Sequence, residues 1–293
     1  MKTFCMVLQK PRLLVHLHLF YTDQLPYFLQ KLKNITRCKW DLIVTLTQTN
    51  PSVEKELKTF KPNVKIIQVE NKGYDIWPFL QVLSQSDLSQ YNYILKLHTK
   101  NTRADEARFF EIKSNTTYLW RNMLVDSLLS SERTFLRNLT ILEKNPKIGM
   151  LACAPCIVKR SITYLEDTSL FENLIKTLHL KTSCRFFCAG TMFMIRPQIV
   201  TKLLNAHFTE KDFSTSVSHT GGTATLAHAI ERVFIPLFYD CKMHVYPLQN
   251  FTYTFKHFLY LLFHHFFSIT NENKQKVLWL LWMKIPLSKK PLS

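Results

Sequence analysis

The sequence predicts an α/β fold built on a doubly wound, mostly parallel β-sheet, followed by a C-terminal helical extension. Short segments rich in β-branched and aromatic residues alternate with amphipathic segments over the first hundred residues, the order of consecutive β-α-β units. The 293 residues are 46% hydrophobic and 20% charged, a composition that supports one sizeable core. We expect the α/β domain at residues 11–245 and a basic, aromatic tail at residues 246–293.

The first hundred residues supply four expected strands and the helices between them. Asp23 and Ser52 are the residues that we expect to cap the first two helices. Right-handed crossovers place the loops that follow the strands at one edge of the sheet, where ligands bind in such folds. The expected strands are 13–21, 41–46, 64–69 and 93–97, and the expected helices begin at Leu25, Ser52 and about Ile76.

The rest of the chain continues with helices and buried strands. Helical patterns cover 118–144, 198–206 and 225–234, and apolar segments at 148–153 and 188–195 predict buried strands. A Gly-rich segment at 219–223 predicts a loop.

Charge and cysteine content restrict the partners and the compartment. Lys and Arg total 38 against 21 Asp and Glu, and this net charge of +17 favours an acidic partner. The lysines are dispersed and form no nucleic-acid-binding module, so we expect no nucleic acid. Seven Cys, and no long apolar run of signal-peptide type at residues 1–10, favour a cytoplasmic protein.

The tail mixes aromatic and basic side chains. Residues 255–290 combine Phe, Trp, Leu and Tyr with His and Lys, the composition of an anchor at an anionic membrane surface. No segment reaches the roughly 20 apolar residues of a spanning helix. The alternative is a pair of helices that packs on the core.

Two loops at the expected binding edge carry candidate ligand-binding residues. Asn71 and Asp75 can hydrogen-bond a base or ribose, and Gly73 permits a turn with positive φ. His98 and Lys100 follow the fourth strand, where Lys100 can bind a diphosphate. The alternatives are an ordinary Asn/Gly turn and a lysine that ends a strand in solvent.

A second group of candidates lies further along the chain. Gly190 and Thr191 follow Phe187, and Gly190 allows close backbone approach; with His219 they are candidates for binding an acceptor, although a buried strand with a bulge explains the same residues. Cys153, Cys156, Cys184 and Cys188 have the residue type of a zinc site, but their apolar flanks favour buried, inert thiols.

Taken together, the motifs resemble the rhamnan synthesis F family over about residues 13–238. The matching segments are VHLHLFY at 15–21, ENKGYDIWPFL at 70–80, KLHTK at 96–100, NPKIG at 145–149, AGTMF at 189–193 and HAIER at 228–232. Tyr74, where the family is expected to have a basic residue, and the region 155–185 depart from that pattern, and these departures bear on the identity of the sugar.

The resemblance implies a GT-A-like glycosyltransferase of cell-surface polysaccharide or lipopolysaccharide O-antigen assembly. Its donor would be a nucleotide-diphosphate sugar, dTDP-L-rhamnose, its acceptor a lipid-linked glycan, and its location the inner face of the cytoplasmic membrane. GT-A enzymes hold a metal with Asp-x-Asp after the fourth strand. Here His98-Thr99-Lys100 stands there, so we expect no required cofactor, with Mg²⁺ or Mn²⁺ as compatible ions.

An inverting transfer needs a carboxylate base, and the position of Glu231 in a helix after the 219–223 loop suggests this role. His228, three residues earlier on the same helix face, would orient it or the acceptor. The alternatives are Asp75 as the base and a structural pairing of Glu231 with Arg232. The competing function is a non-catalytic subunit that binds glycan or lipid in a polysaccharide assembly complex.

Overall fold

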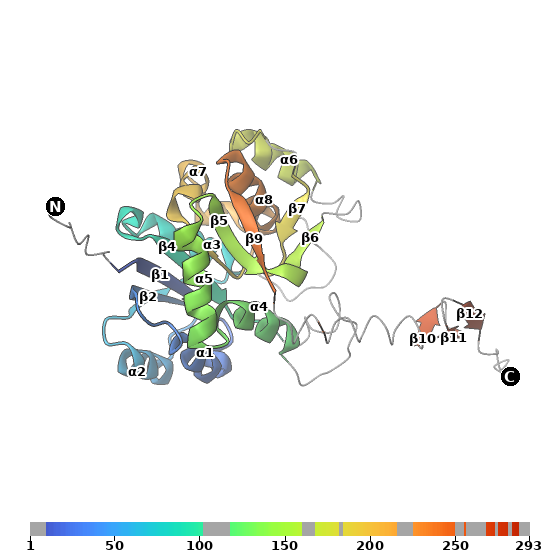
Figure 1. Ribbon diagram of the computed structural model, residues 1–293, viewed down its shortest axis with the longest axis horizontal. Coiled ribbons are helices and arrows are strands. Elements are labelled where there is room, and N and C mark those ends of the chain that lie inside the picture. Colours follow the sequence, from blue (N-terminus) through green and yellow to red (C-terminus); the bar gives the residue numbers. More distant parts are fainter. Residues whose placement is uncertain are drawn as a thin grey trace, which may run out of the picture.

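The computed structural model describes residues 10–101, 118–159, 168–181, 184–215, 225–249, 255, 268–272, 275–280 and 283–286. Within these ranges seven strands form the main sheet, in the order β3-β2-β1-β4-β8-β5-β9 (Figure 1). The first four strands of that order are parallel, β8 is antiparallel to both of its neighbours, and β9 is parallel to β5. The strands are β1 (Arg12–His18), β2 (Lys39–Leu46), β3 (Lys65–Gln68), β4 (Tyr93–His98), β5 (Ile148–Cys153), β8 (Phe193–Ile195) and β9 (His244–Leu248). The predicted α/β fold with a mostly parallel sheet is confirmed.

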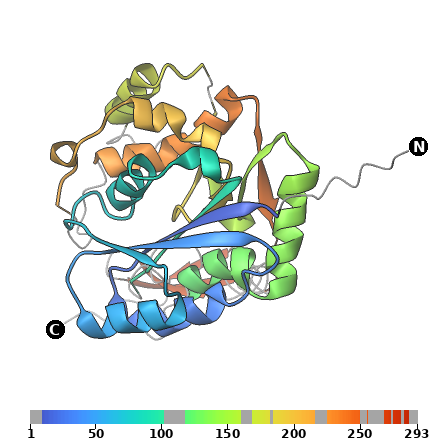
Figure 2. The same ribbon diagram turned by 90° about the vertical axis from the view of Figure 1, so that its left-hand side faces the viewer.

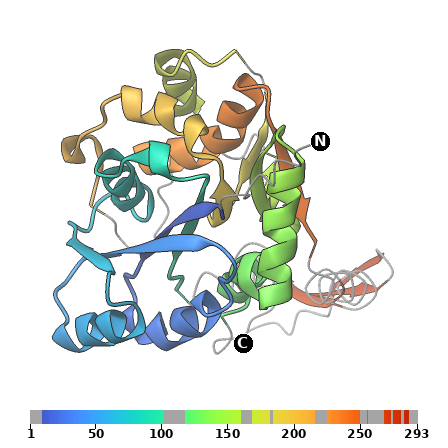
Figure 3. The ribbon, with the colours of Figure 1, turned by 60° about the vertical axis from the view of Figure 1, so that its left-hand side comes forward.

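Helices cover both faces of this sheet, as Figures 2 and 3 show. One hydrophobic cluster joins one face to the first group of helices, α1 (Leu25–Leu32), α2 (Pro51–Phe60), α4 (Leu119–Leu129) and α5 (Glu132–Lys144). A second cluster joins the other face to α3 (Ile76–Ser84), α6 (Thr168–Thr177), α7 (Thr201–Asn205) and α8 (Leu226–Asp240).

The alternation of side chains along β1 and β4 determines what reaches each face. Successive residues of a strand point to opposite faces. The odd-numbered apolar residues of both strands join the first cluster. The even-numbered positions place His16, His18, Lys96 and His98 on the face of α3 and α8, and all four are buried. Because the strands pair in register, His18 lies beside His98 and His16 beside Lys96.

Two helix starts differ from the predictions. Asn50, not Ser52, caps α2: its side chain accepts the Val53 N–H at 3.2 Å, and Pro51 occupies the first helical position, where its missing N–H costs nothing. Asp23 lies inside a short 3₁₀ turn at Thr22–Gln24, so Gln24 precedes α1.

The predicted strand 188–195 is two strands separated by a turn. β7 (Phe186–Cys188) pairs with β6 (Ile157–Lys159) in a small second sheet, whereas β8 lies in the main sheet. Gly190 and Thr191 have φ of +84° and +44°, which reverses the chain between them. Apolar periodicity alone does not reveal such a turn inside a buried segment.

The tail also differs from the helical prediction where the structure describes it. β9 extends the main sheet to Leu248, past the expected boundary at 245. Three antiparallel strands follow, β10 (Ser268–Glu272), β11 (Gln275–Leu280) and β12 (Met283–Pro286), and Figure 1 shows them apart from the main sheet, towards the right of the view. Ile269, Thr270 and Val277 are β-branched and favour strands over helices. Among the described residues, none of the helices has the length and apolar character to cross a membrane.

Candidate functional site

A buried ion pair lies at the centre of the candidate site. Lys96, in the middle of β4, has a side chain that is 0% exposed, and its ammonium is paired with Asp75, the residue that precedes α3. The Lys96 Nζ also donates to Thr191 at its carbonyl oxygen (3.0 Å) and hydroxyl oxygen (3.1 Å). The Thr191 hydroxyl in turn donates to Asp75 Oδ2 at 2.5 Å. Residues from three distant segments therefore meet around one carboxylate.

The buried charges of Asp75 and Lys96 compensate each other. Burial alone would raise the pKa of the Asp75 carboxyl. The ammonium groups of Lys96 and Lys100 and the hydrogen bond from Lys96 outweigh burial and hold that pKa well below its usual range, and His98 adds to this effect only when its ring is protonated. Burial lowers the pKa of Lys96, and Asp75 opposes this shift. The pair is thus ionised inside the fold, where its hydrogen bonds compensate for lost hydration.

His98 holds the next turn from the same face of β4. Its Nε2 donates to the carbonyl oxygen of Gly190 at 2.6 Å, and it lies 3.6 Å from Asp75 Oδ2. Burial lowers the pKa of the His98 imidazole well below its usual value, so the ring is neutral near pH 7. The His98 side chain and this hydrogen bond are both buried, so His98 holds the backbone of the turn at Gly190.

Glu231 lies on the other side of the same turn. Its Oε1 accepts the backbone N–H of Gly190 at 2.8 Å, which positions a carboxylate of α8 beside the strand ends. Burial raises the pKa of the Glu231 carboxyl, although Arg232 and Lys100 act in the opposite direction. A carboxylate whose pKa lies above its usual value is better matched to proton abstraction at neutral pH.

His228 lies one turn before Glu231 on α8. Its Nδ1 is 2.6 Å from the hydroxyl of Thr225, the residue that caps the helix, and its ring lies 5.2 Å from that of Tyr74 in an edge-to-face contact. The ring contact between His228 and Tyr74 therefore joins α8 to the loop that precedes α3.

Two left-handed turns frame these groups. Gly73 and Tyr74 have φ of +61° and +55°, and Gly190 and Thr191 have φ of +84° and +44°. A Cβ at Gly73 would lie 2.6 Å from the Phe213 ring, so glycine is required there for space as well as for conformation. Positive φ at the β-branched Thr191 is an uncommon conformation, and it persists because the Lys96 and Asp75 contacts fix it.

Lys100 is held at the end of β4 by a buried amide. Gln24 donates from Nε2 to the carbonyl oxygen of Lys100 at 2.7 Å and accepts the Lys100 N–H at 3.4 Å. Arg121 donates to the same Gln24 oxygen at 3.1 Å and lies over two tyrosine rings. The Lys100 ammonium lies 4.2 Å from the Trp120 ring centroid and lowers the pKa of Asp75, so its charge acts at the site.

The structure gathers most of the predicted residues at one place. Asp75, His98, Lys100, Gly190, Thr191, His228 and Glu231 lie around the two turns, with Gly73 in the first of them. Asn71 lies in the same loop as Gly73, and His219 falls outside the described residues.

Sequence reasoning missed Lys96 and Gln24. A lysine at an inward position of an apolar strand, flanked by Leu95 and Leu97, is the signal that could have identified Lys96. Gln24 gave no local signal, because only the fold brings its amide to Lys100.

The residues at the end of β4 do not fit a divalent metal. His98 is bonded to Gly190, Lys100 is a cation, and the carboxylates of Asp75 and Glu231 already accept hydrogen bonds from Lys96 and Gly190. Among the residues that the structure describes, no three His, Cys, Asp or Glu side chains gather as metal ligands. The described cysteines are free thiols.

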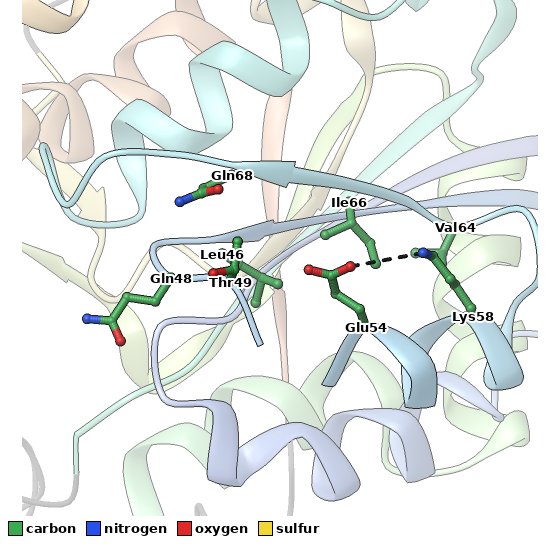
Figure 4. A pocket seen from close by; sticks show the side chains of 8 residues that line it. All are labelled: Leu46, Gln48, Thr49, Glu54, Lys58, Val64, Ile66 and Gln68. Atoms are coloured by element: carbon green, nitrogen blue, oxygen red, sulfur yellow. Dashed lines mark ion pairs between the residues drawn. The ribbon is translucent and has the colours of Figure 1, made fainter. Parts of the chain in front are cut away.

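A separate hollow of about 260 Å³ lies between α2 and the edge of the sheet (Figure 4). Leu46 and Ile66 are among the apolar residues that line it, and Glu54 and Lys58 approach to 4.0 Å at one side. Asp75, Lys96 and Glu231 are not among the residues that line this hollow.

A family model described as "Rhamnan synthesis protein F" matches residues 2–243. The chain belongs to the rhamnan synthesis protein F family. Two curated relatives, both called uncharacterized protein WxcX and from two strains of Xanthomonas campestris pv. campestris, are 27% identical over 228 residues, or 76% of this chain. The chain spans 30% of the length of these relatives.

Several solved structures align with the chain at low identity. Staphylococcus aureus TarS 1–349 is 8% identical, with 81% of this chain and 58% of TarS covered and a TM-score of 0.43. The Pyrobaculum calidifontis mannosyltransferase PcManGT, with GDP-Man and Mn²⁺, is 11% identical, with 67% and 47% covered and a TM-score of 0.32. Mycobacterium tuberculosis glucosyl-3-phosphoglycerate synthase, with Mn²⁺ and UDP, is 9% identical, with 94% and 90% covered and a TM-score of 0.37.

Proposed function

We propose that this chain is a glycosyltransferase that moves a sugar from a nucleotide-diphosphate donor to a growing glycan. Membership of the rhamnan synthesis protein F family over residues 2–243 is the observation that carries this proposal. The proposed donor is dTDP-L-rhamnose, and the proposed acceptor is a lipid-linked glycan of cell-surface polysaccharide or O-antigen assembly.

On the donor side, Lys100 binds the diphosphate in this proposal. Gln24 holds the backbone N–H and carbonyl oxygen of Lys100. Within the part of the chain that the structure describes, the Lys100 ammonium forms no ion pair of the kind that joins Lys96 to Asp75. A lysine placed in this way supplies positive charge directly to a phosphate. Asn71 and Gly73 in the neighbouring loop are the proposed contacts of the nucleoside, and Asp75 orders that loop through Lys96.

On the acceptor side, Glu231 is the proposed base. The acceptor hydroxyl oxygen forms a bond to the anomeric carbon, the bond from that carbon to the diphosphate oxygen breaks, and its electron pair leaves with the nucleoside diphosphate. The hydroxyl proton passes to Glu231, whose raised pKa suits this task. Gly190, Thr191 and His228 border this side, and His219 belongs to the same proposal from the sequence alone.

Binding of nucleotide sugars to the purified chain tests the donor assignment. A ligand that binds only the folded state stabilises it by about 2.7 kcal/mol at one hundred times its Kd. We expect dTDP-L-rhamnose to raise the melting temperature more than dTDP-glucose, UDP-glucose or GDP-mannose does. Stabilisation by glycan or lipid alone, with no response to any nucleotide sugar, would support the non-catalytic subunit instead.

We further propose that the tail, residues 255–293, brings the enzyme to the inner face of the membrane. Its aromatic and basic residues would bind anionic lipid, and salt would weaken that binding because charges are screened beyond about 10 Å at ~0.1 M ionic strength. Co-sedimentation with phosphatidylglycerol vesicles should be lost on deletion from Phe255 and should be absent with phosphatidylcholine vesicles. Unchanged co-sedimentation of the truncated chain would refute the proposal.

A further inference from the structure

The Gly190–Thr191 turn is held on its two successive carbonyl groups by two side chains of one strand. Lys96 Nζ donates to the Thr191 carbonyl oxygen at 3.0 Å, and His98 Nε2 donates to the Gly190 carbonyl oxygen at 2.6 Å. Alternation along β4 places these two side chains on the same face, two residues apart. The turn is therefore fixed to the most central part of the sheet.

The same turn contacts Glu231. The Gly190 N–H donates to Glu231 Oε1 at 2.8 Å, so any rotation of the turn moves the donor that orients this carboxylate. The turn depends on these contacts, because Thr191 is held at a φ of +44°, which a β-branched residue rarely adopts. Leu124 packs closely on its other side, where a Cβ at Gly190 would lie 2.8 Å away.

The geometry points to Lys96 and His98 as positioning residues of the transfer reaction, which hold the Gly190–Thr191 turn so that its N–H orients the Glu231 carboxylate. This inference rests on the proposed function. Neither residue reaches the reactants, because the Lys96 side chain is 0% exposed and the His98 side chain is 4% exposed.

Other titratable groups also surround Glu231. His228 and Arg232 share α8 with it, Asp75 precedes α3, Lys96, His98 and Lys100 belong to β4 and its end, and Cys188 lies in β7. Substituting Lys96 would change this field as well as the turn. Substituting the neutral His98 removes a hydrogen bond without removing a charge, and it is the cleaner probe.

The test is the pH dependence of dTDP release from dTDP-L-rhamnose by the purified full chain carrying His98→Leu. Without its His98 contact the turn loosens, and Glu231 loses the hydrogen bond from the Gly190 N–H. Because this hydrogen bond lowers the pKa of Glu231, its loss raises that pKa. We expect the ascending limb of kcat to move to higher pH and kcat to fall by about 10- to 100-fold, while KM changes less than about threefold.

His98→Gln keeps an N–H donor near the position of Nε2 and should restore the wild-type limb. His16→Leu makes the same change at another buried histidine of this face, one bonded to Thr45, and should leave the limb in place. The position of the limb is independent of how much protein is folded. If His98→Leu yields no folded protein, His98→Asn, whose shorter amide falls short of Gly190, takes its place.

An unshifted limb in His98→Leu or His98→Asn, or an equal shift in His16→Leu, overturns the inference. The proposed function fails separately, when the wild-type chain binds no nucleotide sugar and releases no dTDP from it.

Discussion

Lys96 and Lys100 carry the same charge four residues apart and have opposite surroundings. The Lys96 ammonium is fully buried and paired with Asp75, whereas Lys100 is half-buried beside the Trp120 ring. We call Asp75, Lys96, His98 and Thr191 the inner cluster, and Lys100 and Glu231 the outer groups. The side chains of the inner cluster pair with one another, and in the proposed function the outer groups act on the donor and the acceptor.

The difference separates two uses of charge within one site. A buried, compensated pair fixes backbone geometry, and its loss appears first in stability. A less buried charge at the site acts on a bound ligand, and its loss appears first in binding or turnover. Substitutions in the two groups should therefore affect different measurements.

Glu231→Gln should have the largest effect on turnover. Loss of a general base lowers kcat by roughly 10²–10⁴-fold, whereas the amide still accepts the Gly190 N–H and preserves the fold. The measurement is kcat for sugar transfer, with urea unfolding alongside. Glu54→Gln, at an exposed pair on α2, is the matched control. Near wild-type turnover in Glu231→Gln, with Asp75→Asn binding donor but inactive, would move the base to Asp75.

Lys96→Met should have the largest effect on stability. It leaves the Asp75 carboxylate buried without its cation, a change that costs about 3–5 kcal/mol of unfolding free energy. The double variant Lys96→Met/Asp75→Asn should recover part of this loss, because it removes both charges. Urea unfolding measures both values, and a loss below about 1 kcal/mol in Lys96→Met would show that the pair does not stabilise the fold.

Acid should destabilise the chain through its buried histidines. Burial lowers the pKa of His18 to about 4 and lowers the pKa values of His16 and His98. The unfolded state, with pKa near 6.5, then binds more protons, so stability falls as pH drops from about 6.5 towards 4, by about 1.4 kcal/mol per pH unit for each such histidine.

Urea unfolding from pH 7 to pH 5 measures this slope. His18→Asn keeps a side-chain group near Thr45 and should make the slope shallower, whereas His244→Asn, at an exposed position of β9, should not. An equal slope in the wild type and His18→Asn would contradict the assignment.

Lys100→Ala should have the smallest effect, a loss of affinity for the donor. Loss of one charge-assisted contact weakens donor binding by several-fold up to about tenfold with little change in stability. Lys65→Ala, an exposed lysine of β3, is the control. Donor binding by the wild type should be unchanged in EDTA, since no described residues around Lys100 fit a metal. Wild-type affinity in Lys100→Ala, or loss of donor binding in EDTA, would refute the role of Lys100.

The sequence predicted the parallel half of the sheet well, because each strand there is a short segment rich in β-branched and other apolar residues, bounded by polar turns. The prediction was wrong where one apolar segment forms parts of two strands. Residues 188–195 contain a turn and parts of two sheets, and only the positive φ of Gly190 and Thr191 separates them.

The sequence identified individual candidate residues of the site, but it did not predict the hydrogen bonds that join them. Asp75 and Glu231 stood out as carboxylates near loops, yet their hydrogen bonds to Lys96 and Gly190 depend on segments that are far apart in the sequence. Thr191, predicted on the acceptor side, is also bonded to Asp75 and Lys96, and the sequence did not indicate these contacts.

Release of dTDP from dTDP-L-rhamnose in EDTA, with a glycan acceptor present, tests the central claim most directly. The account predicts steady release and sugar transfer by the wild type, weaker donor use by Lys100→Ala at equal kcat, and loss of nearly all turnover by Glu231→Gln. Equal release by the wild type and Glu231→Gln, or glycan binding with no turnover of any nucleotide sugar, would contradict it.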